Sequence, residues 1–221
     1  IIIAAKQNNI KKLLNVTSSC MYPRNAQNPL KEEAILTGEL EPTNEGYAIA
    51  KIFSQRLCSY IVSEDTSFMY KTIIPCNLYG KWDKFDENNS HMIPAVIKKV
   101  YNAKKNNTNV EIWGSGKARR EFMYASDFAE FIWYGVNNFN KMPFLMNVGL
   151  GKDYTINEYY NVISKVIGFN GKFINNTSKP EGMKQKLVDI SKQIEFGWMP
   201  KYSLEEGIKE TYKYFLENVN N

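Results

Sequence analysis

Two short apolar runs on either side of a long helical pattern constrain the fold of this chain more than any other feature. Residues 11–19 and 68–75 read as strands built from apolar and small residues, as in a sheet that is covered on both faces. Residues 45–63 lie between them and repeat apolar side chains at helical spacing. A strand, a helix and a second strand in this order form a βαβ unit. The sequence therefore predicts an α/β fold with a parallel sheet.

The helix expected at residues 45–63 is apolar around more than one face, and Thr43 or Asn44 precedes it as a candidate N-cap. Its apolar residues are Ile49, Ile52, Phe53, Leu57 and Ile61. Such a helix packs on two sides. Either it lies deep in the core, or it packs one side on the sheet and the other on a partner subunit, which would make the protein a dimer.

The second part of the chain has a different pattern of elements. Helices are expected around residues 93–104, 127–136, 157–166 and 204–218, and short strands around residues 110–113, 144–148 and 172–174. This pattern predicts a smaller α/β lobe. We expect residues 1–80 to form the sheet domain and residues 81–221 the lobe, with residues 115–140 returning to the sheet domain.

Composition and charge narrow the classes of partner. The net charge of +5 is spread over isolated lysines, so binding to nucleic acid is not expected, while binding of a small anion such as a diphosphate remains open. Three cysteines without a CxxC pair suit a reducing, cytoplasmic environment, and no metal site is expected. No apolar stretch approaches the length of a membrane span, so no membrane association is expected.

Tyr47 and Lys51 lie one helical turn apart, near the start of the helix that follows the strand ending in Ser18. This spacing puts the phenol and the ammonium on one face. A nearby ammonium favours the phenolate, which makes Tyr47 a usable proton donor to a developing alkoxide, and Ser18 could hydrogen-bond the same oxygen. A second match to the spacing, Tyr101 and Lys105, is expected at the frayed end of a helix rich in Lys and Asn.

An ordered series of motifs resembles one family over essentially the whole chain. The chain resembles the GDP-L-fucose synthase family, whose members are NADPH-dependent epimerase/reductases of the extended short-chain dehydrogenase class. The motifs are Ser18-Ser19-Cys20-Met21-Tyr22-Pro23, Tyr47-Ala48-Ile49-Ala50-Lys51, Asn77-Leu78-Tyr79-Gly80, Asn89-Ser90-His91-Met92-Ile93-Pro94, Trp113-Gly114-Ser115-Gly116, Arg120-Glu121-Phe122 and Lys179-Pro180-Glu181-Gly182.

The resemblance implies a Rossmann-type sheet, of which this chain holds the C-terminal part, and a lobe that binds a GDP-sugar. It implies that Ser18, Tyr47 and Lys51 support hydride reduction at C4 of a keto sugar, with Tyr47 as proton donor. Cys20 and His91 match the base and the acid that invert C3 and C5 before reduction. Epimerisation of a ketone needs such a pair on opposite faces of an enolate. From the residues alone, Cys20 could equally be a small core residue, and His91 a helix cap or a surface residue.

The resemblance also implies the residues that contact the two ligands, and a homodimer formed through the helix that carries Tyr47. NADPH would contact Tyr47, Lys51, Asn77, Leu78 and His91. The GDP-sugar would contact Asn77, Met92, Lys99, Trp113, Arg120 and Lys186, with the cations meeting the diphosphate and the indole near the base or the sugar.

Several positions depart from the family pattern. Lys99 stands where an arginine is expected and gives up the bidentate guanidinium fork. Cys76 replaces a threonine, and Tyr124-Ala125 replaces the usual pair after Arg120-Glu121-Phe122. No Gly-rich dinucleotide turn precedes Ser18, and residues 1–9 read as the last turns of a helix, so we expect the chain to begin in mid-fold.

Three functional hypotheses follow. The first is the complete epimerase/reductase of GDP-fucose type. The second is a C4 reductase acting on another GDP-4-keto sugar, such as a heptose, with Cys20 and His91 idle. The third is an inactive fragment that binds a GDP-sugar without the cofactor. A nucleotide-sugar dehydratase is disfavoured, because it should carry Asp-Glu where Cys20-Met21 stands. A UDP-galactose-type epimerase would not require the pair Cys20 and His91.

Overall fold

The chain folds into two structural units whose residues alternate along the sequence. The computed structural model describes residues 1–87, 89–179 and 182–219. The first unit comprises Ile1–Asn77, Glu130–Gly151 and Leu187–Met199, and the second comprises Leu78–Ala129, Lys152–Lys186 and Pro200–Asn221. The chain thus leaves the first unit after Asn77, near the expected residue 80. It returns at Glu130–Gly151, where residues 115–140 were expected, and again at Leu187–Met199.

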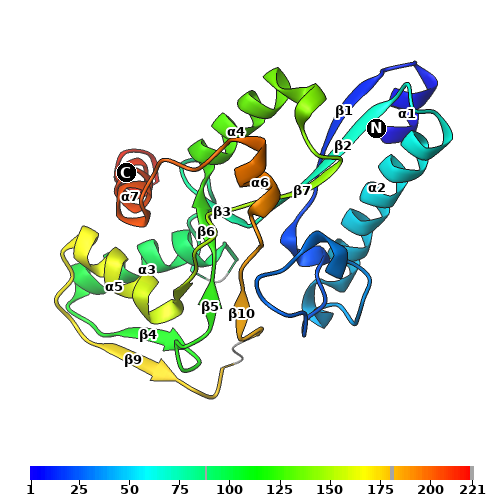
Figure 1. Cartoon of the computed structure of the whole chain (residues 1–221). Helices are drawn as coiled ribbons and strands as arrows, with labels where there is room; N and C mark the ends of the chain where they lie inside the picture. The colour runs from blue at the N-terminus through cyan, green and yellow to red at the C-terminus, as the bar shows by residue number, and fades with distance from the viewer. Residues whose placement is uncertain (88, 180–181, 220–221) are drawn as a thin grey trace. The chain divides into compact units, whose positions relative to one another are not determined.

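A three-stranded parallel sheet forms the centre of the first unit (Figure 1). Its order is β1-β2-β7, with Val16 of β1 opposite Ile73 of β2, and Ile73 opposite Met146 of β7. This arrangement confirms the predicted α/β fold with a parallel sheet. The elements are α1 (Ile2–Gln7), β1 (Lys12–Val16), α2 (Glu45–Glu64), β2 (Met69–Pro75), β7 (Leu145–Val148) and α6 (Ser191–Phe196), with 3₁₀ turns η1 (Ser19–Met21), η2 (Glu32–Ala34), η3 (Pro42–Asn44) and η4 (Phe139–Lys141).

Helix α2 packs one face on β2 and β1 and leaves a second apolar strip in solvent. Ala48, Ile52, Gln55, Cys58 and Ile61 are buried, whereas the Phe53 side chain is 66% exposed and is flanked by exposed Ile49 and Tyr60. The interpretation of α2 as a deep core helix is therefore wrong within this chain. Asn44 precedes α2 as its N-cap but makes no side-chain capping bond, because the 3₁₀ turn η3 leads directly into the helix.

Asn147, in the middle of β7, is buried, and its side chain joins two loops of the first unit, the one after β1 and the one before α6. Its Oδ1 accepts the Tyr22 hydroxyl at 2.6 Å, and its Nδ2 donates to the carbonyls of Leu30 and Asp189 at 2.9 and 3.0 Å. The Asn147 backbone N–H donates to Glu32 Oε1 at 2.8 Å. These bonds fix the long loop after β1 to the carboxyl half of the sheet.

The substitution Asn147→Ala is expected to lower the free energy of unfolding by about 3 kcal/mol, because it removes the acceptor of the buried Tyr22 hydroxyl and the side-chain donor to the Asp189 carbonyl. Chemical denaturation measures this. Asn137→Ala is the matched control, since the exposed Asn137 side chain donates to the Trp133 carbonyl one turn earlier on the surface of α4. If Asn147→Ala lowers the free energy of unfolding by less than about 0.5 kcal/mol, the structural role of Asn147 is contradicted, because substitutions of ordinary surface residues have effects of that size.

The second unit packs three helices, α3, α5 and α7, around a large apolar cluster. Its sheets are small: β4 pairs with β9, β5 pairs with β10 and β8, and β3 pairs with β6. The elements are β3 (Asn77–Tyr79), α3 (Met92–Asn106), β4 (Val110–Trp113), β5 (Arg119–Arg120), β6 (Phe122–Tyr124), β8 (Tyr154–Thr155), α5 (Ile156–Ile167), β9 (Phe173–Asn176), β10 (Gln185–Lys186) and α7 (Leu204–Asn218). Helix α4 (Ala125–Asn137) begins in this unit and ends in the first.

Candidate active site

Ser18 and Cys20 lie in the turn that follows the carboxyl end of β1. Ser18 is the N-cap of the 3₁₀ turn η1, and its Oγ accepts the Cys20 backbone N–H at 3.2 Å. This capping bond fixes the backbone position of Cys20. The Cys20 thiol forms no disulfide, and its side chain is half-buried. A serine hydroxyl and a thiol are thus held two residues apart at the end of a central strand, where ligands of parallel sheets commonly bind.

Tyr47 and Lys51 come to the same strand end from the first turns of α2, which packs against η1. The Lys51 ammonium donates to the carbonyl of Val16, the last residue of β1, at 3.1 Å. It lies 5.6 Å from the centre of the Tyr47 ring, and Tyr47 is 51% exposed. The structure therefore anchors the cation of this pair to the strand that leads into Ser18 and leaves the phenol accessible.

The second Tyr-x-x-x-Lys match has a different environment. Tyr101 lies within α3 rather than at a frayed end, and its ring packs edge-on against Phe215 of α7 at 5.3 Å. Tyr101 therefore contributes to the apolar cluster of the second unit. The expectation that Tyr101 lies at a frayed helix end was wrong, because α3 continues to Asn106 and the Tyr101 ring packs against α7.

The other two cysteines are poor candidates for a base. Cys58 is fully buried, and burial raises the pKa of its thiol to about 11, so this thiol stays protonated at neutral pH. Cys76 is buried, and its Sγ donates to the Asn77 carbonyl at 3.4 Å. Of the three cysteines, Cys20 is the one whose side chain is partly exposed to solvent.

His91 stands immediately before α3 in the second unit, as the N-cap residue of that helix. It makes no side-chain capping bond, and its side chain is 77% exposed. The imidazole is therefore not used to cap the helix, although that was one open interpretation. Its Nδ1 lies 3.5 Å from Asp83 Oδ1.

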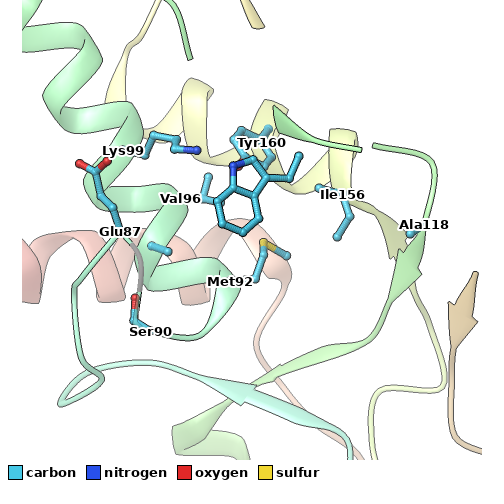
Figure 2. Close-up of a pocket in the computed structure, with 10 residues that line it drawn as sticks. Glu87, Ser90, Met92, Val96, Lys99, Ala118, Ile156 and Tyr160 are labelled. Carbon is cyan, nitrogen blue, oxygen red and sulfur yellow. The ribbon is translucent and has the colours of Figure 1, made fainter. Parts of the chain in front are cut away.

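A pocket of about 290 Å³ opens along α3 (Figure 2), and its lining includes Ser90 and Met92, the two chain neighbours of His91. Met92, Val96 and Lys99 line it from successive turns of α3, and Ile156 and Tyr160 line it from α5. Its other lining residues are Glu87, Ser90, Ala95, Trp113 and Ala118. Burial, with a smaller contribution from Glu111, raises the pKa of Tyr160 to about 12, so the pocket wall is uncharged there. The pocket is largely apolar, and ionic groups lie at its Glu87 and Lys99 end.

Two lysine side chains lie close to the Trp113 ring. The Trp113 side chain is 49% exposed, and the ammonium groups of Lys99 and Lys179 lie 5.8 and 5.4 Å from its ring centre. Lys99 also donates to the Glu111 carbonyl at 2.9 Å. An aromatic platform with flanking ammonium groups suits a planar base next to phosphate.

Arg120 and Lys186 form a second cationic pair. They are register partners on the parallel strands β5 and β10, and Arg120 also donates to the Met183 carbonyl at 2.6 Å. The structure thus brings together two of the predicted diphosphate-binding cations from positions 66 residues apart in the numbering.

The predicted site residues are divided between the two units. Ser18, Cys20, Tyr47 and Lys51 gather at the carboxyl end of β1, and Asn77 closes the first unit at the start of β3. Leu78 opens the second unit, which also holds His91, Met92, Lys99, Trp113, Arg120 and Lys186.

Sequence reasoning missed Asp83, Val96, Tyr160 and Lys179 as site residues. Val96 could have been found from its helical spacing between Met92 and Lys99. Tyr160 and Asp83 reach the site through tertiary contacts that leave no local pattern. Lys179 belongs to a quoted motif whose Pro180 and Glu181 lie outside the described residues.

The described residues offer neither a metal-binding cluster nor a membrane-spanning helix. Within residues 1–87, 89–179 and 182–219, no group of three or more His, Cys, Asp or Glu side chains could hold a metal ion. None of the helices in these ranges is long and apolar enough to cross a membrane.

Comparisons with known proteins agree on one family. Residues 1–149 match the model of the NAD dependent epimerase/dehydratase family. A GDP-L-colitose synthase of Yersinia pseudotuberculosis is 62% identical over the whole chain, which spans 72% of that protein. A GDP-L-fucose synthase of Azorhizobium caulinodans is 45% identical over 98% of the chain and 69% of its own length. The structure of a GDP-mannoheptose C4 reductase from Campylobacter jejuni with NADP bound matches with a TM-score of 0.86, at 32% identity, over 97% of this chain and 73% of that one.

Proposed function

Because this chain belongs to the NAD dependent epimerase/dehydratase family, we propose that it acts as an NADPH-dependent GDP-sugar epimerase/reductase of the fucose and colitose type. The observation that carries the proposal is the group of side chains at the carboxyl end of β1. There Lys51 is bonded to the Val16 carbonyl beside the Tyr47 ring, and the Ser18 turn holds Cys20.

In the reduction step, Tyr47 gives its phenolic proton to the oxygen that develops at C4 of the keto sugar. Ser18 donates a hydrogen bond to the same oxygen, and the Lys51 ammonium stabilises the phenolate that remains. When bound, NADPH supplies the hydride. The chain fits this cofactor at Lys51, because an ammonium has three donors and the Val16 carbonyl takes one, which leaves donors for ribose hydroxyls.

In the epimerisation step, the Cys20 thiolate removes a proton from a carbon next to the C4 carbonyl, and an enolate forms. The His91 imidazolium then gives a proton to the opposite face of that carbon, which inverts it. Cys20 is left as a thiol and His91 as a neutral imidazole, and both return to their starting forms by proton exchange with water. The exposure of the imidazole and the half-exposure of the thiol support these roles.

The second unit binds the nucleotide part of the substrate in this proposal. The pocket along α3 and the Trp113 ring receive the nucleoside, and Lys99, Arg120 and Lys186 meet the diphosphate. A pocket of about 290 Å³ with a few convergent polar groups lies at the lower limit of the usual size of small-molecule sites.

The substitution Trp113→Ala is expected to raise the Kd for GDP by about tenfold or more, because one base–aromatic stack contributes about 1–3 kcal/mol. Isothermal titration calorimetry measures the change. Trp133→Ala is the matched control, since Trp133 is an exposed indole on α4 that does not line the pocket. An unchanged Kd for Trp113→Ala would remove the indole from the nucleotide site.

Product analysis of the protein with NADPH and candidate GDP-4-keto sugars tests the proposed function. Colitose is fucose without the 3-hydroxyl, so its precursor has only C5 to invert, whereas the fucose precursor has C3 and C5. The 62% identity to the colitose synthase favours the 3-deoxy substrate. Absence of NADPH consumption with every GDP-4-keto sugar would overturn the proposal.

A C4 reductase for another GDP-4-keto sugar is the second candidate. The similarity to the GDP-mannoheptose C4 reductase favours it. In that case NADPH would be consumed with a heptose substrate, and no solvent deuterium would enter C3 or C5. Deuterium incorporation at those carbons therefore separates the two candidates.

We further infer that two copies associate through α2. The exposed strip of Ile49, Phe53 and Tyr60 lies on one side of this helix and supports a helix-to-helix contact. Sedimentation velocity at micromolar concentration measures the mass, and the mass of a single chain would contradict the dimer.

A further inference from the structure

The loop between β3 and α3 carries an aspartate that faces the imidazole of His91. Asp83 Oδ1 lies 3.5 Å from His91 Nδ1, and the Asp83 side chain is largely buried at 17% exposure. The same Oδ1 accepts the backbone N–H of Lys84 at 2.9 Å, which fixes the rotamer of the carboxylate. The carboxylate is thus held in place, while the imidazole is free to solvent on its other side.

The turn that presents Asp83 is fixed to α7 at two points. The Lys81 ammonium pairs with Glu210 at 2.9 Å, and the Trp82 ring lies 4.9 Å from the Tyr214 ring. The backbone of Trp82, the second of these anchors, has a φ of +69°, a conformation that bulky residues rarely adopt. Strained backbone of this kind persists where surrounding contacts impose it, and it often occurs at functional sites. Here it directs the next residue, Asp83, toward His91.

The remainder of the loop is organised by Asp86 and Ser90. Asp86 Oδ1 accepts the Asn89 N–H at 2.8 Å, and Ser90 Oγ hydrogen-bonds the backbone of Asp86. His91 follows directly and begins α3 through the bond from the Ala95 N–H to its carbonyl at 3.1 Å. The contacts that position the His91 backbone and the Asp83 carboxylate therefore all come from residues of the second unit.

We propose that Asp83 is the positioning residue for His91, accepting its Nδ1–H so that Nε2 is the nitrogen that exchanges protons with the substrate. This inference rests on the proposed role of His91 as the acid. A carboxylate at Nδ1 accepts the Nδ1–H and so holds that proton on Nδ1 after transfer. Nε2 is then always the atom that loses and regains the proton, and the ring does not need to rotate between turnovers.

The tautomer of His91 can be observed directly, because His91 is the single histidine of this sequence. In protein labelled with ¹⁵N-histidine, the neutral imidazole should show a protonated Nδ1 and a free Nε2, and His91→Gln identifies the signals. Asp83→Ala should shift the population toward the Nε2–H form, which free imidazoles prefer. A wild-type ring protonated mainly on Nε2 would overturn the proposal, whatever the enzyme does.

Deuterium exchange tests the effect on the reaction. Asp83→Ala is expected to slow incorporation of solvent deuterium beside the C4 carbonyl by about tenfold to a hundredfold, a part of the general-acid contribution. NADP⁺-dependent oxidation of the finished GDP-L-sugar, which reverses the hydride step without needing His91, should keep its rate. Asp83→Glu, which keeps the carboxylate, should restore part of the exchange.

Asp86→Ala is the matched control. It also removes a carboxylate that accepts a loop N–H, that of Asn89, whereas the ion pair of His91 is with Asp83. Equal losses of exchange in Asp83→Ala and Asp86→Ala would show that loop integrity alone matters, and would overturn the positioning role. Absence of exchange in the wild-type protein would instead contradict the proposed epimerase function, while the tautomer measurement would still decide the contact between Asp83 and His91.

Discussion

The substitution Tyr47→Phe is expected to lower the rate of C4 reduction by about 10²–10⁴-fold, because it removes the proposed proton donor and keeps the ring. Lys51 would remain bonded to the Val16 carbonyl, so the strand end should keep its structure. NADPH consumption with a GDP-4-keto sugar measures the reduction. Deuterium exchange beside the carbonyl should continue, because the proposed mechanism assigns enolate formation to Cys20 and His91.

Tyr101→Phe provides the control for this prediction. Tyr101 is the other tyrosine with a lysine four residues later, and its ring packs against Phe215 in the apolar cluster. Loss of its hydroxyl should leave the reduction rate unchanged. A Tyr47→Phe protein that reduces the sugar as fast as the wild type would exclude Tyr47 as the donor.

The substitution Cys20→Ala is expected to reduce deuterium exchange at the carbons beside C4 by about 10²–10⁴-fold, because it removes the proposed thiolate base. Direct, slow reduction of the unepimerised ketone should persist, which gives a product of different stereochemistry. Mass spectrometry of the exchanged sugar and NMR of the product measure the two effects.

Cys76→Thr tests whether the effect belongs to Cys20 alone. Threonine is the residue expected by resemblance at this buried position, and its hydroxyl can replace the donation from Cys76 Sγ to the Asn77 carbonyl. Exchange should continue in this variant. Unchanged exchange in Cys20→Ala would remove Cys20 from the mechanism.

The sequence predicted the sheet and the long helices well, because both carry periodic apolar patterns. The βαβ unit at β1, α2 and β2 was expected from two apolar runs and one helical repeat, and it was found. The resemblance to GDP-L-fucose synthases was confirmed by relatives at 45–62% identity. The strands β5, β8 and β10 and the helix α6 were missed, because segments of two to six residues show no period.

The candidate site was predictable where it depends on local spacing and not where it depends on tertiary contacts. Helical spacing placed Tyr47 beside Lys51, but it could not show that Lys51 is bonded to Val16 across 35 positions. Asp83 was invisible to pattern reasoning because its approach to His91 depends on the positive φ of Trp82 and on the anchors at Glu210 and Tyr214. The sequence could not show what packs on the outer face of α2, because an apolar helix face has the same pattern whether it packs in the core of its own chain or against another chain.

Because the three cysteines are buried to different extents, a reporter group can be attached selectively to Cys20. Cys58 and Cys76 are shielded from solvent, so a maleimide or an alkylating probe should modify Cys20 first under native conditions. A fluorophore or spin label introduced there would report on ligand arrival at the end of β1 without any engineered cysteine. The same selectivity makes this thiol the natural target for a covalent inhibitor.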